Sequence, residues 1–229
     1  MCAPVPVREN AMGLRRVGIY GGTFDPVHNG HVEAARGVLK LFELEKLIFV
    51  PAWAPPHKRN LKLTSAFHRF GMLALATQAD QRLLISTVEL DSPDRPYAVD
   101  TITRMLKTDQ RLFFLIGADS WNEITTWFEW QKLLTLCDLI VVTRPGYEVA
   151  AAPAAANVAD LRGKDAIDAR SVLDEQAAPH VFITDVVNVD VSATTVRSLA
   201  RAGDVEELKT MMPGAVADYI GKHGLYKTE

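Results

Sequence analysis

The sequence predicts a single α/β domain with a doubly wound parallel sheet and helices on both faces. Two observations indicate this class. Strand and helix patterns alternate along most of the 229 residues, and the strand patterns are unbroken runs of Val, Ile, Leu and Phe. Such runs are expected when helices cover both faces of a parallel sheet. The sequence contains no internal repeat and no change of composition that would mark a second globular domain.

The expected elements follow from the hydrophobic patterns and their boundary residues. Strands are expected at residues 15–21, 46–52, 82–90, 111–118, 137–144 and 180–186, and helices at residues 31–44, 64–79, 97–107, 130–136, 192–203 and 213–224. The last two helices each begin at a Ser cap or a Pro and end at a Gly. Residues 1–14 are expected to form a flexible N-terminal tail, and residues 15–229 the domain. Within it, the Ala-rich residues 150–178 are expected to form an exposed excursion.

Composition excludes several classes of protein. The net charge of −3 gives no basic footprint, so nucleic acid is a poor candidate partner. Cys2 and Cys137 cannot form a disulfide framework and lack a zinc-binding spacing, which favours a reducing cytoplasm. No apolar run reaches the roughly 18 residues that span a bilayer, and the first residues lack the apolar centre of a signal peptide. We therefore expect a cytoplasmic protein; a homo-oligomeric state stays open.

In sheets of this class, ligands bind beyond the carboxyl ends of the strands. The unusual short motifs of the chain fall at that edge: "GGTFDPVHNGH", "PPHK", "GADS", "TRPG" and "VSATTVR". Because the net charge is slightly negative, any affinity for anions must come from a local site. These loops are where we expect that site.

The motif "GGTFDPVHNGH" has the features of a phosphate-binding turn. Gly21 and Gly22 allow the backbone to approach a ligand closely or to adopt a positive φ. Thr23 and Phe24 offer peptide N–H groups to a phosphate, and Gly30 leaves the start of the following helix uncovered. A dinucleotide oxidoreductase is a weak alternative, because the G-x-G-x-x-G pattern is absent and no acidic residue ends the second strand.

His28 and His31 fall at the start of the helix that follows this turn. A protonated imidazole at that end opposes the helix dipole by about 0.3–1 kcal/mol. A ligand with several negative charges would reverse this penalty. The alternative interpretation is a capped turn with two exposed histidines, and the glycines around them make it the weaker one.

The remaining motifs are less specific. In "VSATTVR", Ser192 is a natural helix cap, Thr194 offers a hydroxyl and Arg197 suits bidentate phosphate contact. Taken alone, this stretch is more typical of a capped amphipathic helix. "PPHK" alone is an exposed basic turn, and Asp119 in "GADS" would either bind a ribose or amine or cap a helix. The aromatic residues of "WFEW" are usually core residues, although such rings also stack on heterocycles.

Together, these motifs resemble those of a known family. "GGTFDPVHNGH" is similar to the H-x-G-H signature of the nucleotidyltransferase superfamily, and "VSATTVR" to its second signature, I-S-S-T-x-I-R. "PPHK", the "GAD…W" segment and "TRPG" resemble the bacterial nicotinate-nucleotide adenylyltransferases, over residues 16–226. The resemblance implies a Rossmann-like fold and transfer of AMP from ATP to nicotinate mononucleotide, which gives deamido-NAD and pyrophosphate in NAD biosynthesis. It also implies Mg²⁺ carried by the ATP phosphates, and we expect no metal site built from protein ligands alone.

Matched residue by residue, the resemblance implies three groups of site residues. The catalytic group is His28, His31, Lys58 and Arg197. The ATP-binding group is Gly21, Gly22, Thr23, Phe24, Gly30, Gly117, Asp119, Ser192, Thr194 and Arg197. The group that binds the nicotinate nucleotide is Trp53, His57, Lys58, Tyr97, Trp127, Phe128 and Arg144.

Three residues depart from the family pattern. Ala193 replaces the second Ser of the second signature, Ala98 replaces a Thr expected near the nicotinate, and Trp53 replaces a more usual Asn. Two of these changes fall on the side of the pyridine carboxylate, so a nicotinamide-nucleotide or other superfamily adenylyltransferase stays open as an alternative. A non-catalytic nucleotide sensor is less favoured, because both motif histidines and Arg197 are present. A class I aminoacyl-tRNA synthetase fragment would need a K-M-S-K-S-like loop, which is absent.

Overall fold

The fold is built on a parallel sheet, which confirms the predicted class. The structure is a computed structural model that describes residues 14–53, 63–91, 97–143, 149, 157–174, 180–187 and 189–227. Its strands pair in parallel in the order β3-β2-β1-β4-β5-β7-β6. The strands are β1 (Arg15–Gly22), β2 (Lys46–Pro51), β3 (Leu83–Ile85), β4 (Gln110–Gly117), β5 (Asp138–Val142), β6 (Val158–Asp160) and β7 (Val181–Thr184). The order reverses between β1 and β4, the position at which such sheets bind ligands.

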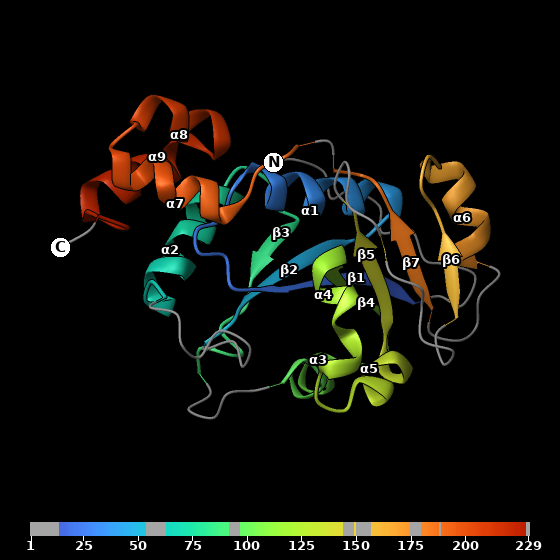
Figure 1. Cartoon of the computed structure of the whole chain (residues 1–229). Helices are drawn as coiled ribbons and strands as arrows, with labels where there is room; N and C mark the ends of the chain where they lie inside the picture. Colours follow the sequence, from blue (N-terminus) through green and yellow to red (C-terminus); the bar gives the residue numbers. More distant parts are fainter. Residues whose placement is uncertain are drawn as a thin grey trace, which may run out of the picture.

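Helices cover both faces of this sheet (Figure 1). One face carries α1 (Asn29–Leu41), α2 (Ala66–Thr77), α6 (Ala166–Asp174), α7 (Ala193–Ala202), α8 (Val205–Met211) and α9 (Gly214–His223). The other carries α3 (Ala98–Met105), α4 (Ala118–Asn122), the 3₁₀ helix η2 (Ile124–Thr126) and α5 (Trp130–Leu136). The three C-terminal helices lie together beside α2 (Figure 1).

Side chains that alternate along the central strands divide the core into two layers. On β4, Phe113 and Leu115 belong to the layer beneath α1 and α2. Leu112, Phe114 and Ile116 belong to the layer beneath α3, α4 and α5. The continuous apolar run of this strand is therefore explained by burial of both faces, as its sequence predicts.

The structure contains elements that the sequence analysis did not predict. β6 and α6 fall inside residues 150–178, the range expected to form an excursion, and β6 adds an outer parallel strand next to β7. β3 covers only Leu83–Ile85 of the predicted strand at 82–90. The predicted Gly stops of α7 and α9 are confirmed, because Gly203 and Gly224 follow these helices with left-handed φ values.

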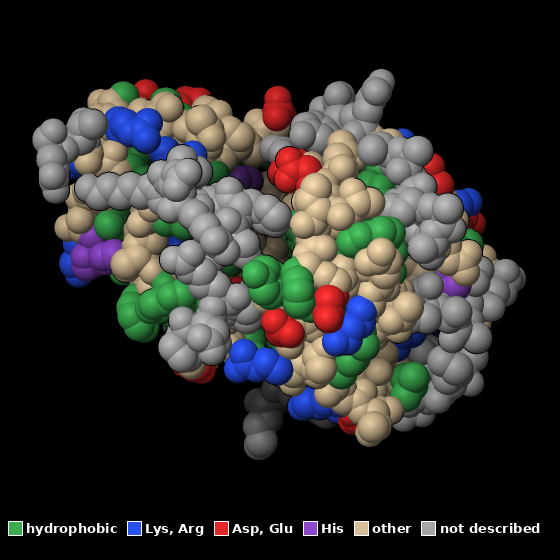
Figure 2. All heavy atoms as spheres, turned by 60° about the horizontal axis from the view of Figure 1, so that its bottom comes forward, with side chains coloured by type: hydrophobic (Ala, Val, Ile, Leu, Met, Phe, Trp, Pro, Cys, Tyr) green, Lys and Arg blue, Asp and Glu red, His purple; other side chains and the backbone are tan. Residues whose placement is uncertain are grey.

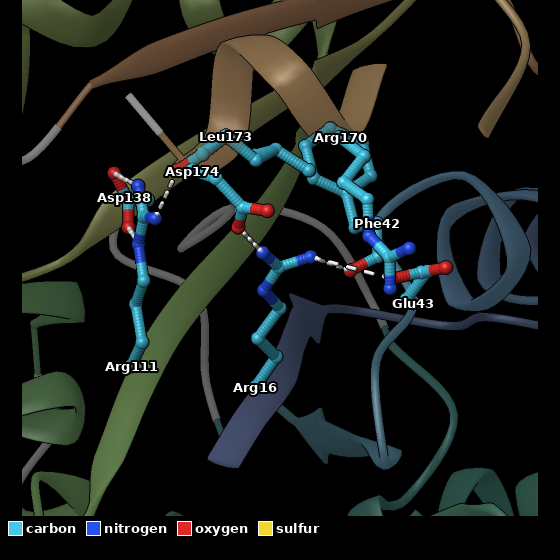
Figure 3. Close-up of polar contacts among 8 residues, drawn as sticks. All are labelled: Arg16, Phe42, Glu43, Arg111, Asp138, Arg170, Leu173 and Asp174. Atoms are coloured by element: carbon cyan, nitrogen blue, oxygen red, sulfur yellow. Dashed lines mark hydrogen bonds and ion pairs between the residues drawn. The ribbon is translucent and has the colours of Figure 1, made fainter. Parts of the chain in front are cut away.

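An ion-pair network holds the amino-terminal edge of the sheet, opposite the strand ends that bind ligands (Figure 3). Arg111 at the start of β4 donates from Nε to the Oδ2 of Asp138 at 2.7 Å and from Nη1 to the carbonyl of Leu173 at 2.7 Å. The other oxygen of Asp138 accepts from the backbone N–H of His180 at 2.9 Å. Because Asp138 is buried, these bonds compensate for its loss of hydration.

A second part of this network ties β1 to α6 and to the end of α1 (Figure 3). The guanidinium of Arg16, only 5% exposed, is bonded to the carboxylate of Asp174 and to the carbonyl of Phe42. Glu43 lies 3.9 Å from Arg16 and 2.8 Å from Arg170. The ion pairs therefore fix α6 against the sheet although its sequence has little apolar periodicity.

The surface carries no basic patch on the face that Figure 2 shows, as far as the described residues go. Acidic and basic side chains are interspersed there with hydrophobic ones. This agrees with the small net charge of −3. Within the described part of the chain, no helix combines the length and the apolar character needed to cross a bilayer.

Candidate active site

Two clefts adjoin at the carboxyl end of β1. The first has a volume of about 440 Å³ and the second a volume of about 420 Å³. They share five lining residues: Gly21, Gly22, Thr23, Ser120 and Trp127. Ligands bound in the two clefts would therefore meet at the end of β1, next to the turn that the sequence singles out.

In the turn after β1, Phe24 is the residue with an unusual backbone conformation. Phe24 has φ 49°, whereas neither Gly21 nor Gly22 has a positive φ, so of the two alternatives expected for these glycines only close backbone approach remains. A Cβ at Gly22 would lie 2.8 Å from the Phe24 ring, which explains the glycine by close packing. The ring of Phe24 in turn packs edge-on against the ring of His31, with centroids 5.1 Å apart. Gly22 thus lets the Phe24 side chain fold back and support the imidazole.

The two motif histidines stack at the start of α1, where both line the first cleft. Their ring centroids are 3.8 Å apart. His28 is the N-cap residue of the helix and is buried. A Cβ at Gly30 would lie 3.1 Å from the His28 Nδ1, so the absence of a side chain at Gly30 makes room for this ring.

The helix cap fixes the tautomer of His31. The backbone N–H of His28 donates to the His31 Nδ1 at 3.2 Å. A nitrogen that accepts a hydrogen bond carries no proton, so the neutral imidazole has its proton on Nε2. His31 can therefore donate from Nε2 to a ligand in the first cleft without carrying a positive charge. The conflict with the helix dipole that a protonated imidazole would cause does not arise.

The second signature brings Arg197 to the same cleft from α7. Its Nη1 donates to the carbonyl of Asp25 at 2.7 Å and its Nη2 to the Thr194 hydroxyl at 3.1 Å. Ser192 lines the cleft, but its Oγ caps α7 by accepting from the Thr195 N–H at 3.1 Å. Thr194 is exposed and is not among the residues that line the cleft. Of this signature, Arg197 is thus the side chain best placed to bind an anion.

Asp119 and Gly117 also line the first cleft. Gly117 ends β4 and is the N-cap residue of α4, and Asp119 is an exposed residue in the first turn of that helix. Trp127 follows η2 and lines both clefts. A ligand that spans the two clefts would therefore pass this indole.

Arg69 is a site-supporting residue that the sequence analysis missed. Its side chain, only 1% exposed, donates four hydrogen bonds to backbone carbonyls. The acceptors are Thr23 at 2.7 Å, Ala52 at 2.6 Å, Trp53 at 3.1 Å and Thr64 at 3.0 Å. Arg69 thus joins the loops after β1 and β2 to α2. Its place on the buried stripe of that helix, three residues after Ala66, was a readable signal.

A second missed group holds the motif turn from the C-terminal end of the chain. The Tyr226 hydroxyl donates to the Asp25 Oδ1 at 2.6 Å, and the Thr64 N–H donates to the Oδ2 at 3.2 Å. Burial and the nearby carboxylate raise the pKa of Tyr226 well above its ordinary value. Because Asp25 lies between Phe24 and the first histidine, these bonds fix the turn in place. No local pattern links residues 201 positions apart.

Aromatic side chains line the second cleft. The rings of Tyr97 and Phe128 lie 4.5 Å apart at 31°, and both line the cleft together with Trp127 and Phe114. Trp53 is not among the lining residues; its ring packs against Phe67 with centroids 6.2 Å apart. The structure thus brings together three of the residues expected to bind the nicotinate nucleotide. Tyr97, Trp127 and Phe128 all line the second cleft.

The second cleft also contains Glu89, which the sequence analysis did not single out. Its Oε1 accepts from the Thr101 hydroxyl at 2.8 Å, and its carboxylate is hydrogen-bonded to the Trp53 backbone. Burial raises the pKa of Glu89 to about 7. A half-buried carboxyl group with such a pKa inside a cleft is a candidate functional group.

Three of the predicted site residues, His57, Lys58 and Arg144, lie outside the described residues. Among the residues that are described, no three or more His, Cys, Asp or Glu side chains are grouped so that they could hold a metal ion.

A parallel sheet with two adjacent imidazoles at a helix start and an arginine in the same cleft is typical of a nucleotidyltransferase, and the comparisons agree. A family model described as cytidylyltransferase-like matches residues 19–199, so the chain belongs to that family. Within it, the chain belongs with the nicotinate-nucleotide adenylyltransferases. A protein of Corynebacterium jeikeium (strain K411) named "Probable nicotinate-nucleotide adenylyltransferase" is 36% identical over 208 residues, which cover 90% of this chain and 98% of that protein.

Further relatives carry the same name. One from Geobacter sp. (strain M21) is 36% identical over 92% of this chain and 98% of its own length. Among solved structures, "Plasmodium falciparum nicotinic acid mononucleotide adenylyltransferase complexed with NaAD" superposes with a TM-score of 0.68 at 19% identity, over 93% of this chain and 97% of that one. At that identity, the structural likeness supports the Rossmann-like fold alone.

Proposed function

We propose that this protein transfers the adenylyl group of ATP to nicotinate mononucleotide, forming deamido-NAD and pyrophosphate in NAD biosynthesis. The observation that carries the proposal is the meeting of two clefts at the end of β1. One presents the His31 Nε2–H and Arg197, which suit phosphate oxygens. The other presents aromatic rings, which suit a planar pyridine. The names of the relatives supply the same reaction.

The reaction is a direct in-line displacement at the α-phosphorus of ATP. An oxygen of the 5′-phosphate of nicotinate mononucleotide forms the new P–O bond, and the bond from the α-phosphorus to the pyrophosphate oxygen breaks. The attacking phosphate is already an anion at neutral pH, so the step needs no general base and no covalent enzyme intermediate. Catalysis then consists of positioning and of stabilising charge on the phosphoryl oxygens.

His28, His31 and Arg197 supply that stabilisation. The α1 N-terminus and the His31 Nε2–H face the first cleft, where they would bind the oxygens at the α-phosphorus. Arg197 would bind the outgoing phosphates, and its bond to the Asp25 carbonyl fixes its position relative to the turn. Thr23 and Phe24 would add backbone contacts. Lys58 is proposed for the junction of the two substrates by family resemblance.

Residues of the first cleft fit a magnesium ion that arrives on the triphosphate. Asp119 and Glu123 offer exposed carboxylates, and the described residues contain no three-ligand cluster. Such a donor set suits Mg²⁺, which keeps waters and phosphate oxygens as ligands. Bound there, the ion would neutralise phosphate charge.

The pyridine ring would lie in the second cleft against Tyr97, Trp127 and Phe128. His57, Lys58, Arg144 and Trp53 remain proposed contacts of the acceptor on the strength of the resemblance. The spacing of the cysteines favours the cytoplasm as the place of the reaction.

Pyrophosphate release by the purified chain tests the proposal. With Mg·ATP, we expect release to require nicotinate mononucleotide, and mass spectrometry should identify deamido-NAD as the product. Nicotinamide mononucleotide, phosphopantetheine and a reaction without acceptor serve as controls, as does CTP in place of ATP. A clear preference for nicotinamide mononucleotide, for phosphopantetheine or for CTP would refute the proposed function.

A further inference from the structure

The second cleft contains one carboxyl group that the proposed transfer step does not use. Among its described lining residues, Glu89 is the single Asp or Glu. The others are small or hydroxyl residues and four aromatic residues. A carboxyl group in such a lining interacts strongly with a bound ligand, because little water screens it.

Two elements hold this carboxyl group in place. Thr101 on α3 is buried and donates its hydroxyl proton to the Glu89 Oε1 at 2.8 Å. The backbone of Trp53, just after β2, supplies a further hydrogen bond. With donors from two separate elements, the carboxyl group keeps a defined orientation at the wall of the cleft.

We infer that Glu89 is a specificity-determining residue of the acceptor cleft, whose carboxyl group faces the substituent of the pyridine ring and makes the choice between an acid and an amide substituent depend on pH. The inference rests on the proposed function, since it requires the pyridine nucleotide to occupy the second cleft. It goes beyond that function by assigning the discrimination to a residue outside the sequence motifs.

The charge of Glu89 decides the sign of this effect. Burial raises its pKa to about 7, while the Thr101 hydroxyl and the positive charges of Arg104 on α3 and Arg69 on α2 act in the opposite direction. Tyr97 is a further polar side chain that lines the cleft. The protonated form of Glu89 donates a hydrogen bond to a pyridine carboxylate. The ionised form repels that carboxylate but accepts a hydrogen bond from an amide N–H.

A pH series with two acceptors on the wild-type enzyme provides the test. We would measure kcat/KM for nicotinate mononucleotide and for nicotinamide mononucleotide between pH 6 and 8.5. Both acceptors have the same 5′-phosphate and react with the same ATP, so titration of phosphates and of the motif histidines cancels in their ratio. The ratio of acid to amide should fall by about tenfold over this range as Glu89 ionises.

Two variants separate this role from a structural one. Glu89→Gln cannot ionise, so its ratio should be independent of pH. Thr101→Val removes a hydrogen bond that stabilises the ionised carboxylate, so the fall should move to higher pH. The Thr101→Val and wild-type profiles remain decisive even if Glu89→Gln fails to fold.

The results distinguish the inference from the proposed function. If neither pyridine nucleotide is turned over, the proposed function itself is wrong. If both are turned over with a ratio that does not change with pH in the wild type, or if only the acid is turned over at every pH, the inference alone is overturned. If only the amide is turned over, the proposed acceptor is wrong. A ratio that still falls with pH in Glu89→Gln also overturns it.

Discussion

Replacing His31 by asparagine separates the two roles that the structure gives to this imidazole. The Nδ1 of His31 accepts the N–H of His28 in the helix cap, and the Nε2–H is the donor offered to the first cleft. An asparagine oxygen can take the place of Nδ1, but asparagine has no atom at the position of Nε2. His31→Asn therefore keeps the cap and removes the donor.

The expected loss of activity follows from that missing donor. Removing one preorganised hydrogen-bond donor from a developing oxyanion costs about 2.7–4 kcal/mol, or about 100- to 1,000-fold in kcat. The cap retained by asparagine should leave the free energy of unfolding within about 0.5 kcal/mol of wild type, because the asparagine oxygen can accept the same N–H of His28. Steady-state pyrophosphate release and thermal unfolding measure the two quantities.

His31→Ala is the matched control, because alanine loses both the donor and the cap. It should show the same fall in kcat and in addition lose about 1 kcal/mol of stability. A kcat near wild type in His31→Asn would refute the assignment of the Nε2–H to transition-state binding. If both variants are as stable as wild type, this hydrogen bond of the cap contributes nothing to stability; if both lose stability equally, asparagine does not replace it.

Three further outcomes are expected. Asp138→Ala leaves the buried Arg111 without its carboxylate and should cost about 3–5 kcal/mol, lowering Tm by about 6–20 °C, while kcat of the folded fraction is unchanged because this edge of the sheet is remote from the clefts. Tyr226→Phe removes the hydrogen bond to the buried Asp25 and should cost about 1.5–3 kcal/mol with a lower kcat; an unchanged Tm would contradict the role of this bond. Because the pKa of Glu89 is raised in the folded protein, this carboxyl group keeps its proton at pH values where the unfolded chain has released it. The free energy of unfolding therefore falls as pH rises from about 4.5 to about 7. Glu89→Gln should therefore raise Tm at pH 8.5 but not at pH 4. At about 1.4 kcal/mol per pH unit, the gain in free energy of unfolding at pH 8.5 has an upper limit of about 3 kcal/mol. Thermal unfolding at the two pH values checks this.

Local patterns predicted most of the sheet and the face on which the site lies. The strands at β1, β2, β4, β5 and β7 were readable because burial on both faces makes their sequences continuously apolar. β6 and α6 were missed because their stability comes from pairing with β7 and from ion pairs such as Arg16–Asp174 rather than from an apolar pattern of their own. The short strand β3 likewise depends on its neighbour β2.

For the site, the sequence indicated the groups that lie on its two short signature motifs. His28, His31 and Arg197 were predicted, and the structure places all three at the first cleft. Arg69 and Glu89 were not, because each acts on atoms from other segments of the chain. A buried charged side chain is explained only by its partners, and those partners are distant in sequence.

The sequence by itself determined the α/β class, the resemblance to nucleotidyltransferases and the positions of the motif residues. These are local properties, since hydrophobic period, caps and a turn with its helix start all lie within a few residues of one another. The tertiary structure decided the tautomer of His31, the positive φ at Phe24, the anchoring of Asp25 by Tyr226 and the place of Glu89 in the acceptor cleft. Each of these depends on contacts between particular atoms a few ångströms apart. Where the atoms belong to segments remote in sequence, only the packing of the whole chain brings them together.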